Sequence, residues 1–213
     1  MDINYTGNFT NKKEHIDKYI FEKYLQKENG IFIEAGANDG ITQSNTYILE
    51  KYYGWKGICI EPCIQEYIKC CKIRSSYNYN CALVPFEYNN PTVKMDVGGG
   101  LMASINGRRL NSSYLYDVSC NNLQNILDEI NIHNIDFFSL DVEGFELDVL
   151  KGIDFKKTNI TYCLIEYNPS LLIELLDFML SNSYEFIENV SNFSLETNPG
   201  WDGLHNDYLF KRL

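Results

Sequence analysis

Apolar and polar positions follow two different periods along the chain, and their order predicts an α/β protein. Short apolar runs, typical of strands buried on both faces of a sheet, occur at 31–35, 57–60, 135–140 and 160–165. Stretches with apolar residues three or four positions apart, typical of amphipathic helices, follow these runs at 44–53, 64–73, 144–151 and 168–180. This alternation predicts a mostly parallel sheet with helices on both faces.

The beginning of the chain departs from this alternation. Residues 12–27 are predicted to form a leading helix that stops at Asn29-Gly30. We therefore expect an N-terminal helical leader over residues 1–30 and a single domain over residues 31–213.

The middle of the chain departs from it as well. Residues 77–86 and 92–97 are predicted to be strands around the turn Asn89-Asn90-Pro91, and Gly98-Gly99-Gly100 opens a polar loop. We expect residues 89–113 to be an insertion, which forms either a substrate-facing lid or a flexible surface excursion.

Composition narrows the classes of function. The 213 residues include 18 basic and 29 acidic side chains, which gives a formal net charge of −11. We expect no nucleic-acid partner, because phosphate contacts need a basic surface, and no membrane insertion, because no apolar run approaches the roughly 20 residues that cross a bilayer. Seven cysteines without a Cys-x-x-Cys pair indicate free thiols in a reducing, cytoplasmic location.

The first candidate site is the turn after the first strand, Glu34-Ala35-Gly36-Ala37-Asn38-Asp39-Gly40. Glycines in such a turn let the backbone approach a ligand closely, and the next helix offers free N–H groups. Glu61 ends the second strand, where an acid binds ribose hydroxyls in nucleotide-type sites. The alternative is a structural turn with a surface glutamate. Asn38 replaces the second glycine of a dinucleotide fingerprint, so S-adenosylmethionine fits better than NAD.

The second candidate site follows the strand at 135–140. Asp141 lies at the carboxyl end of this strand, where open α/β sheets bind ligands. An acid at a strand tip loses hydration unless it has a partner, so Asp141 is hard to interpret as a surface residue. Glu143 follows in the turn. Glu146 lies on the first helical turn, where we favour a stabilising charge at the helix N-terminus.

Together these segments resemble the FkbM-type family of S-adenosylmethionine-dependent O-methyltransferases. The resemblance rests on residues 32–40, 44–50 and 54–62, and most specifically on 135–146 with 149–152. It covers roughly residues 31–166 and the closing strand near 206–210. Glu34 stands where the family commonly has aspartate, and residues 89–111 match no motif of the family.

The resemblance implies a single Rossmann-like class I methyltransferase domain with a seven-stranded, mostly parallel sheet whose last strand is antiparallel. It also implies that S-adenosylmethionine is the cofactor, with its adenine near the tip of the third strand. The residues that we expect around the cofactor are Glu34, Gly36, Ala37, Asn38, Gly40, Ser44, Asn45, Glu61, Pro62, Cys81, Ala82 and Asp141.

The family methylates hydroxyls, often on sugars in glycans or natural products, so a saccharide or glycan acceptor is expected. A sugar hydroxyl is a poor nucleophile, so a general base or a metal ion assists. The candidate catalytic residues are Asp141, Glu143, Glu166 and His205, and the candidate Mg²⁺ ligands are Asp141, Glu166 and Asn168. The alternatives are a helix cap for Asn168 and a solvated loop residue for His205.

Several readings stay open on the sequence alone. A nicotinamide-dependent oxidoreductase and a non-catalytic interaction module are the other classes of function that the same fold allows. Arg108 and Arg109 are either a solvated pair or contacts for a phosphate or glycan. Fusion with glycosyltransferase domains in a larger protein is a further possibility.

Overall fold

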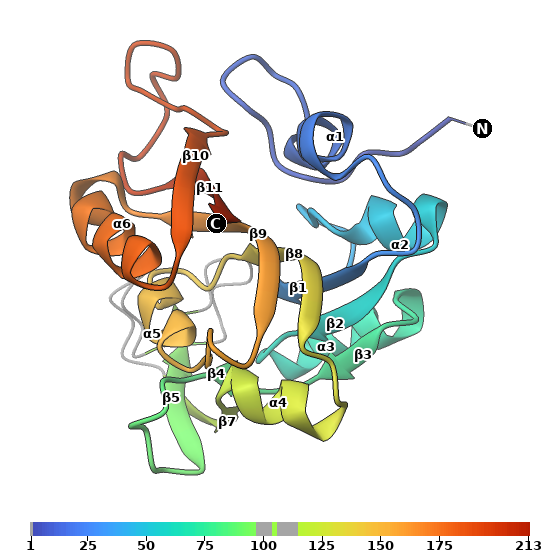
Figure 1. Ribbon diagram of the computed structural model, residues 1–213, viewed down its shortest axis with the longest axis vertical. Helices are drawn as coiled ribbons and strands as arrows, with labels where there is room; N and C mark the ends of the chain where they lie inside the picture. Colours follow the sequence, from blue (N-terminus) through green and yellow to red (C-terminus); the bar gives the residue numbers. More distant parts are fainter. Residues whose placement is uncertain (1, 97–103, 106–114) are drawn as a thin grey trace.

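The fold is built on a central seven-stranded sheet (Figure 1). The computed structural model describes residues 2–96, 104–105 and 115–213. The strand order is β10-β11-β9-β8-β1-β2-β3. The strands are β1 (Ile31–Ala35), β2 (Lys56–Ile60), β3 (Tyr77–Tyr79), β8 (Asn134–Leu140), β9 (Asn159–Tyr167), β10 (Tyr184–Asn189) and β11 (Asn206–Arg212). β11 pairs antiparallel with both of its neighbours and the other pairs are parallel, which confirms the predicted architecture.

Helices cover both faces of this sheet because successive strand residues point to opposite sides. Phe138 packs in one apolar cluster with side chains of α4 (Leu123–Glu129), α5 (Glu146–Leu150) and α6 (Leu172–Ser181). Its neighbour Phe137 packs in a second cluster with side chains of α2 (Tyr47–Tyr53) and α3 (Ile64–Ile73). The two clusters lie on opposite faces of the sheet, as the helices on either side of it do in Figure 1.

The N-terminal leader packs into the second cluster. α1 (Ile16–Ile20) continues into a π-helical turn at Phe21–Leu25, so the helix is shorter than the predicted 12–27. Ile16 and Ile20 are buried beside Phe32 and Trp55. The leader therefore completes the core on that face of the sheet.

The middle of the chain forms a second, smaller sheet that the sequence analysis did not predict. Its strands are β4 (Ala82–Leu83), β5 (Thr92–Asp96), β6 (Ser104–Ile105) and β7 (Tyr116–Asn121), in the order β4-β7-β5-β6. The predicted hairpin of 77–86 with 92–97 is wrong, because β5 pairs with β6 and β7 instead. The strand predicted at 77–86 is divided at Asn80, whose side-chain amide donates to the carbonyls of Glu61 and Pro62 and draws the chain across the tip of β2.

The remaining part of the expected insertion, residues 97–103 and 106–113, lies outside the described residues, and so do Arg108 and Arg109. All seven cysteines are described and carry free thiols, as predicted. Within the described ranges, no helix has both the length and the apolar composition that crossing a bilayer requires.

Candidate functional site

The carboxyl ends of β1, β2 and β8 surround a hollow with about 770 Å³ of empty space, part of it open to solvent. We call it the donor hollow. Seven predicted cofactor residues line it: Gly36, Asn38, Glu61, Pro62, Cys81, Ala82 and Asp141. Residues that the sequence analysis did not identify complete the lining, among them Thr42, Gln43, Met95, Ile105 and Phe145. Met95 and Ile105 come from β5 and β6, so the small sheet contributes apolar side chains to this hollow.

Gly36 shapes the donor hollow through a backbone contact. Its φ is +84°, and a Cβ at this position would lie 1.8 Å from the carbonyl oxygen of Asp141. The backbone N–H of Asp141 donates to the carbonyl of Ala35 at 3.1 Å, so the ends of β1 and β8 are joined at this point. Only glycine fits at position 36, because any Cβ would collide with the carbonyl oxygen of Asp141. This requirement holds with or without a bound ligand.

Glu61, the residue predicted to bind ribose, follows β2 directly and lies on the wall of the donor hollow. Its carboxylate accepts hydrogen bonds from the backbone N–H groups of Asn38 (2.8 Å) and Cys63 (2.7 Å). Burial raises the pKa of Glu61 to about 7, even though these two N–H groups lower it. Each carboxylate oxygen has two lone pairs, so both retain a position for a ligand hydroxyl.

The other predicted cofactor residues do not line the donor hollow; they lie behind the turn that forms its wall. Glu34 is buried and accepts hydrogen bonds from Ser44 Oγ, from the backbone N–H of Asn45 and from Thr46 Oγ1. Ala37 is part of the apolar cluster under α2 and α3. Arg74, at the end of α3, contacts both Glu34 and the carbonyl of Gly40. The sequence analysis missed Arg74, because nothing in the local pattern shows that it folds back onto a residue 40 positions earlier.

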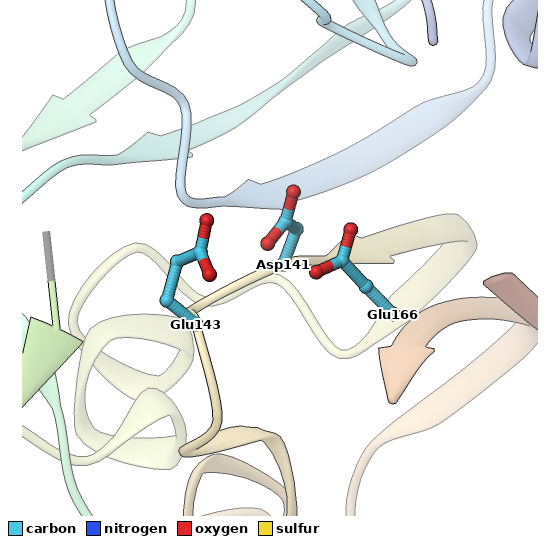
Figure 2. A group of neighbouring side chains, drawn as sticks. All are labelled: Asp141, Glu143 and Glu166. Atoms are coloured by element: carbon cyan, nitrogen blue, oxygen red, sulfur yellow. The ribbon is translucent and has the colours of Figure 1, made fainter. Parts of the chain in front are cut away.

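Three carboxylates converge beside the donor hollow. Figure 2 shows Asp141, Glu143 and Glu166 turned toward one another, and one oxygen of each lies within 4.8 Å of the others. Asp207 on β11 is paired in register with Glu166 on β9 and is buried. Burial, and then the charges of Asp141 and Asp207, raise the pKa of Glu166 well above its ordinary value. The sequence analysis identified the first three acids and missed Asp207, whose neighbour across the sheet depends on the antiparallel register.

Glu146 lies in the first turn of α5, where the sequence placed it, and its carboxylate also supports the turn before that helix. Its carboxylate is 2% exposed and accepts from the backbone N–H groups of Val142 (3.2 Å) and Gly144 (2.9 Å). Burial raises the pKa of Glu146 to about 7. Glu146 therefore holds the turn that carries Glu143, which has a left-handed backbone with a φ of +57°.

A second hollow, with about 1050 Å³ of empty space, adjoins the donor hollow at Glu143. We call it the acceptor hollow. Glu166 and Asn168 also line it, with Tyr167 and the exposed side chains of Leu171 and Leu204 at its edge. The acceptor hollow therefore combines five carboxylates, one amide, the ammonium group of Lys151 and apolar groups.

Asn168 and His205 are placed differently from the three carboxylates. Asn168 Oδ1 accepts from the N–H (2.9 Å) and the hydroxyl (2.7 Å) of Ser170, which is the helix-cap role that the sequence left open. His205 lines another hollow, beside Phe193 and Trp201, with its Nδ1 3.1 Å from Asp202 Oδ1. The metal role of Asn168 and the base role of His205 stay predictions.

The buried acids predict a pH dependence of stability. We expect the free energy of unfolding to fall as the pH rises from about 5 to 8, because the folded-state pKa values of Glu61 and Glu146 are about 7 and that of Glu166 is also raised. A raised pKa contributes stability that is full below the unfolded-state pKa and is lost as the pH rises through the folded-state pKa. Urea unfolding at pH 5.5 and pH 8 measures the change.

Glu166→Gln removes one of these acids and is expected to reduce the loss of stability between the two pH values. Glu185→Gln, an exposed change on β10, is the matched control and should leave the loss as it is in the wild type. An identical loss in all three proteins would contradict the assignment of the pH dependence to this cluster.

Comparison with known proteins agrees with this geometry. The family model for the methyltransferase FkbM domain matches residues 34–186, which is well over half of the chain. No match is found among curated protein sequences. Among solved structures, the methyltransferase FkbM from Methylobacillus flagellatus is similar, with a TM-score of 0.52 and 15% identity over 85% of this chain and 43% of that one. This chain thus corresponds to less than half of that protein.

Two other solved structures are similar at lower TM-scores. A putative RNA methyltransferase from Pyrococcus horikoshii has a TM-score of 0.48 and 10% identity over 92% of this chain and 81% of that chain. TrmK from M. capricolum, in complex with S-adenosylhomocysteine, has a TM-score of 0.47 and 11% identity over 93% of this chain and 68% of that chain. Identities this low concern the fold alone and carry no argument about the acceptor.

The matched range contains the turn after β1, Glu61 and the segment from β8 to α5. The seven-stranded sheet is that of class I methyltransferases, which supports S-adenosylmethionine as the cofactor over a nicotinamide. The chain therefore belongs to the FkbM methyltransferase family and has the fold of S-adenosylmethionine-dependent methyltransferases.

Proposed function

We propose that this protein is an S-adenosylmethionine-dependent O-methyltransferase that methylates a hydroxyl of a sugar, such as a deoxysugar, in a glycan or glycoconjugate. The observation that carries the proposal is the meeting of the donor and acceptor hollows at Glu143. Carboxylates, an amide and a phenol line the acceptor hollow, and each can accept from or donate to a ring hydroxyl. The exposed leucines at its edge, Leu171 and Leu204, suit the apolar face or methyl group of a deoxysugar.

The residues of the donor hollow fit the cofactor. Glu61 would accept the ribose hydroxyls, and Pro62 with Cys81 and Ala82 would lie against the adenine. When bound there, S-adenosylmethionine supplies a methyl group activated on a sulfonium, which the acceptor oxygen takes as the carbon–sulfur bond breaks. The carboxylates of Asp141 and Glu143 favour the positive charge of the sulfonium, and most of the rate enhancement comes from alignment of the two reactants.

The hydroxyl proton passes to a carboxylate at the boundary of the two hollows. Asp141 lines the donor hollow, and Glu166 lines the acceptor hollow with a raised pKa. A carboxylate with a raised pKa is a stronger base than an ordinary one, so the environment of this cluster favours general base catalysis. We assign the proton to Asp141, because it lines the donor hollow and its carboxylate lies beside those of Glu143 and Glu166, which line the acceptor hollow.

The same three carboxylates would also suit a bound Mg²⁺ ion. Asp141, Glu143 and Glu166 offer oxygen ligands of the kind that Mg²⁺ prefers, whereas Asn168 already caps a helical turn. We expect excess EDTA to abolish turnover and added Mg²⁺ to restore it. Binding of S-adenosylhomocysteine, measured in parallel by calorimetry, separates loss of the metal from loss of the cofactor. Full turnover in excess EDTA would exclude the metal and leave Asp141 with its assigned proton-accepting role alone.

The acceptor class is tested with S-adenosylmethionine that carries a tritiated methyl group. The panel contains neutral mono- and oligosaccharides, deoxysugar glycosides, sugar phosphates, RNA and protein. We expect label in neutral saccharides, because an acceptor that brings phosphates to an acidic rim incurs an electrostatic cost. A parallel reaction with Glu61→Ala, which should give little product at limiting cofactor, shows that the label depends on the donor hollow. Label in RNA or protein and in no saccharide would overturn the proposed substrate class.

A further inference from the structure

Arg74 forms a buried network behind the wall of the donor hollow. Its guanidinium is 3.0 Å from Glu34 and 2.7 Å from Glu50, and the side chain is 1% exposed. It also donates to the carbonyl of Gly40 at 3.2 Å and to Thr46 Oγ1 at 2.8 Å. The network thus joins β1, the β1–α2 loop, α2 and the end of α3 through one side chain.

The β1–α2 loop needs such a support. Asn38 and Gln43 both line the donor hollow and both have left-handed backbones, with φ of +47° and +58°. Residues other than glycine rarely adopt this conformation, and it persists where the surrounding structure fixes it. On the side of the donor hollow, the backbone N–H of Asn38 is held by the carboxylate of Glu61. On the side away from the hollow, hydrogen bonds hold the rest of the loop: Arg74 donates to the carbonyl of Gly40, and Glu34 accepts from residues 44–46.

The geometry of the guanidinium is specific to this task. Its planar fork donates to Glu50 from Nε, to Glu34 and Gly40 from Nη1 and to Thr46 from Nη2. A lysine would keep the charge but cannot reach these partners together. The stem of Arg74 also packs against Gly40, where a Cβ would lie 2.8 Å from Arg74 Cγ.

We infer that Arg74 is a positioning residue for the cofactor: through Glu34 and Gly40 it holds the β1–α2 loop in the conformation that presents Asn38 and Gln43 to the donor hollow. The inference rests on the proposed use of the donor hollow for S-adenosylmethionine. It gives a role to Glu34, Gly40, Ser44 and Asn45, which surround this network instead of the hollow.

Calorimetric titration with S-adenosylhomocysteine tests the inference on Arg74→Lys, at a temperature at which the folded state predominates. We expect the Kd to rise at least tenfold relative to the wild type. In turnover assays we expect the KM for S-adenosylmethionine to rise and the KM for the acceptor to stay unchanged. Loss of stability alone would not separate the two KM values in this way.

Arg212→Lys is the matched control. Arg212 donates to the carbonyls of Phe155 (2.8 Å) and Thr158 (3.5 Å) at the end of β11, and neither it nor its partners line the donor hollow. This variant should lose stability and keep the wild-type Kd. If Arg74→Lys does not fold, Thr46→Val replaces it as the test. This change removes the hydrogen bonds of Thr46 Oγ1 with Glu34 and with Arg74 but leaves the ion pair between those two residues in place, and we expect the Kd to rise at least threefold.

The outcomes are distinguishable. A wild-type Kd in the folded variant of Arg74 or Thr46 would overturn the positioning role. Failure of the wild-type protein itself to bind S-adenosylhomocysteine would overturn the proposed function instead.

Discussion

Asp141→Asn is expected to lower turnover by about 10²–10⁴-fold, the range over which a general base contributes. Asp141 lines the donor hollow, and one of its carboxylate oxygens lies within 4.8 Å of those of Glu143 and Glu166, which line the acceptor hollow. The asparagine amide has nearly the same shape but cannot take the proton. The loss cannot be ascribed to unfolding, because the charge of Asp141 raises the pKa of Glu61, Glu146, Glu166 and Asp207. Removal of that charge relieves repulsion among buried acids, so the variant should be at least as stable as the wild type at pH 8.

Two further variants identify the base. Glu174→Gln changes an exposed acid of the acceptor hollow and should keep turnover within a few-fold of the wild type. His205→Ala should also keep turnover if the base is a carboxylate, since His205 lines a different hollow. The single-turnover rate is measured for Asp141→Asn, Glu174→Gln and His205→Ala. A normal rate in Asp141→Asn together with a large loss in His205→Ala would reverse the assignment and make His205 the base.

Gly36→Ala is expected to lower the free energy of unfolding by about 2–5 kcal/mol. The left-handed backbone at position 36 costs a residue with a Cβ about 1–2 kcal/mol, and forcing atoms apart in a packed interior typically costs a further 1–3 kcal/mol. The second cost is certain to arise here, because the new Cβ would meet the carbonyl oxygen of Asp141 at 1.8 Å. Separation of the ends of β1 and β8 would also disturb the donor hollow and weaken cofactor binding.

Gly203→Ala measures the cost of the left-handed backbone without the packing cost. Gly203 has a nearly equal φ of +79°, and no atom lies within 4 Å of the position of its Cβ. We expect this variant to lose only about 1–2 kcal/mol. Urea unfolding of the two variants under the same conditions gives the difference. Equal losses would show that the contact between Gly36 and Asp141 does not limit the fold.

The large sheet could be predicted from the sequence because its central strands are buried on both faces. Runs such as 31–35 and 135–140 are almost wholly apolar, and their order with the helices determines a parallel sheet. The small sheet could not be predicted. β4 and β6 have two residues each, which is too short for a pattern, and β4 pairs with β7 across more than thirty intervening residues. Asn80 ends β3 by side-chain contacts that no local pattern encodes.

The candidate site, too, could be predicted from the sequence only in part. Glu61 and Asp141 follow buried strands directly, so the sequence predicts that both lie at one edge of the sheet, and both line the donor hollow. Arg74 and Asp207 are set by contacts between distant segments, and a sequence pattern does not reveal these. Glu34 was placed near the cofactor because it precedes the first glycine, but its side chain points to the opposite side, toward Arg74.

Calorimetric titration of the wild type and of Glu61→Ala with S-adenosylhomocysteine tests the central claim most directly. The account predicts one bound ligand per chain for the wild type. It predicts a Kd at least tenfold higher for Glu61→Ala, because hydrogen bonds to a charged group contribute about 1.5–3 kcal/mol each and two ribose hydroxyls lose their acceptor. Glu185→Ala, on the exposed face of β10, should bind as the wild type does. No binding by the wild type, or an unchanged Kd in a folded Glu61→Ala protein, would contradict the placement of the cofactor in the donor hollow.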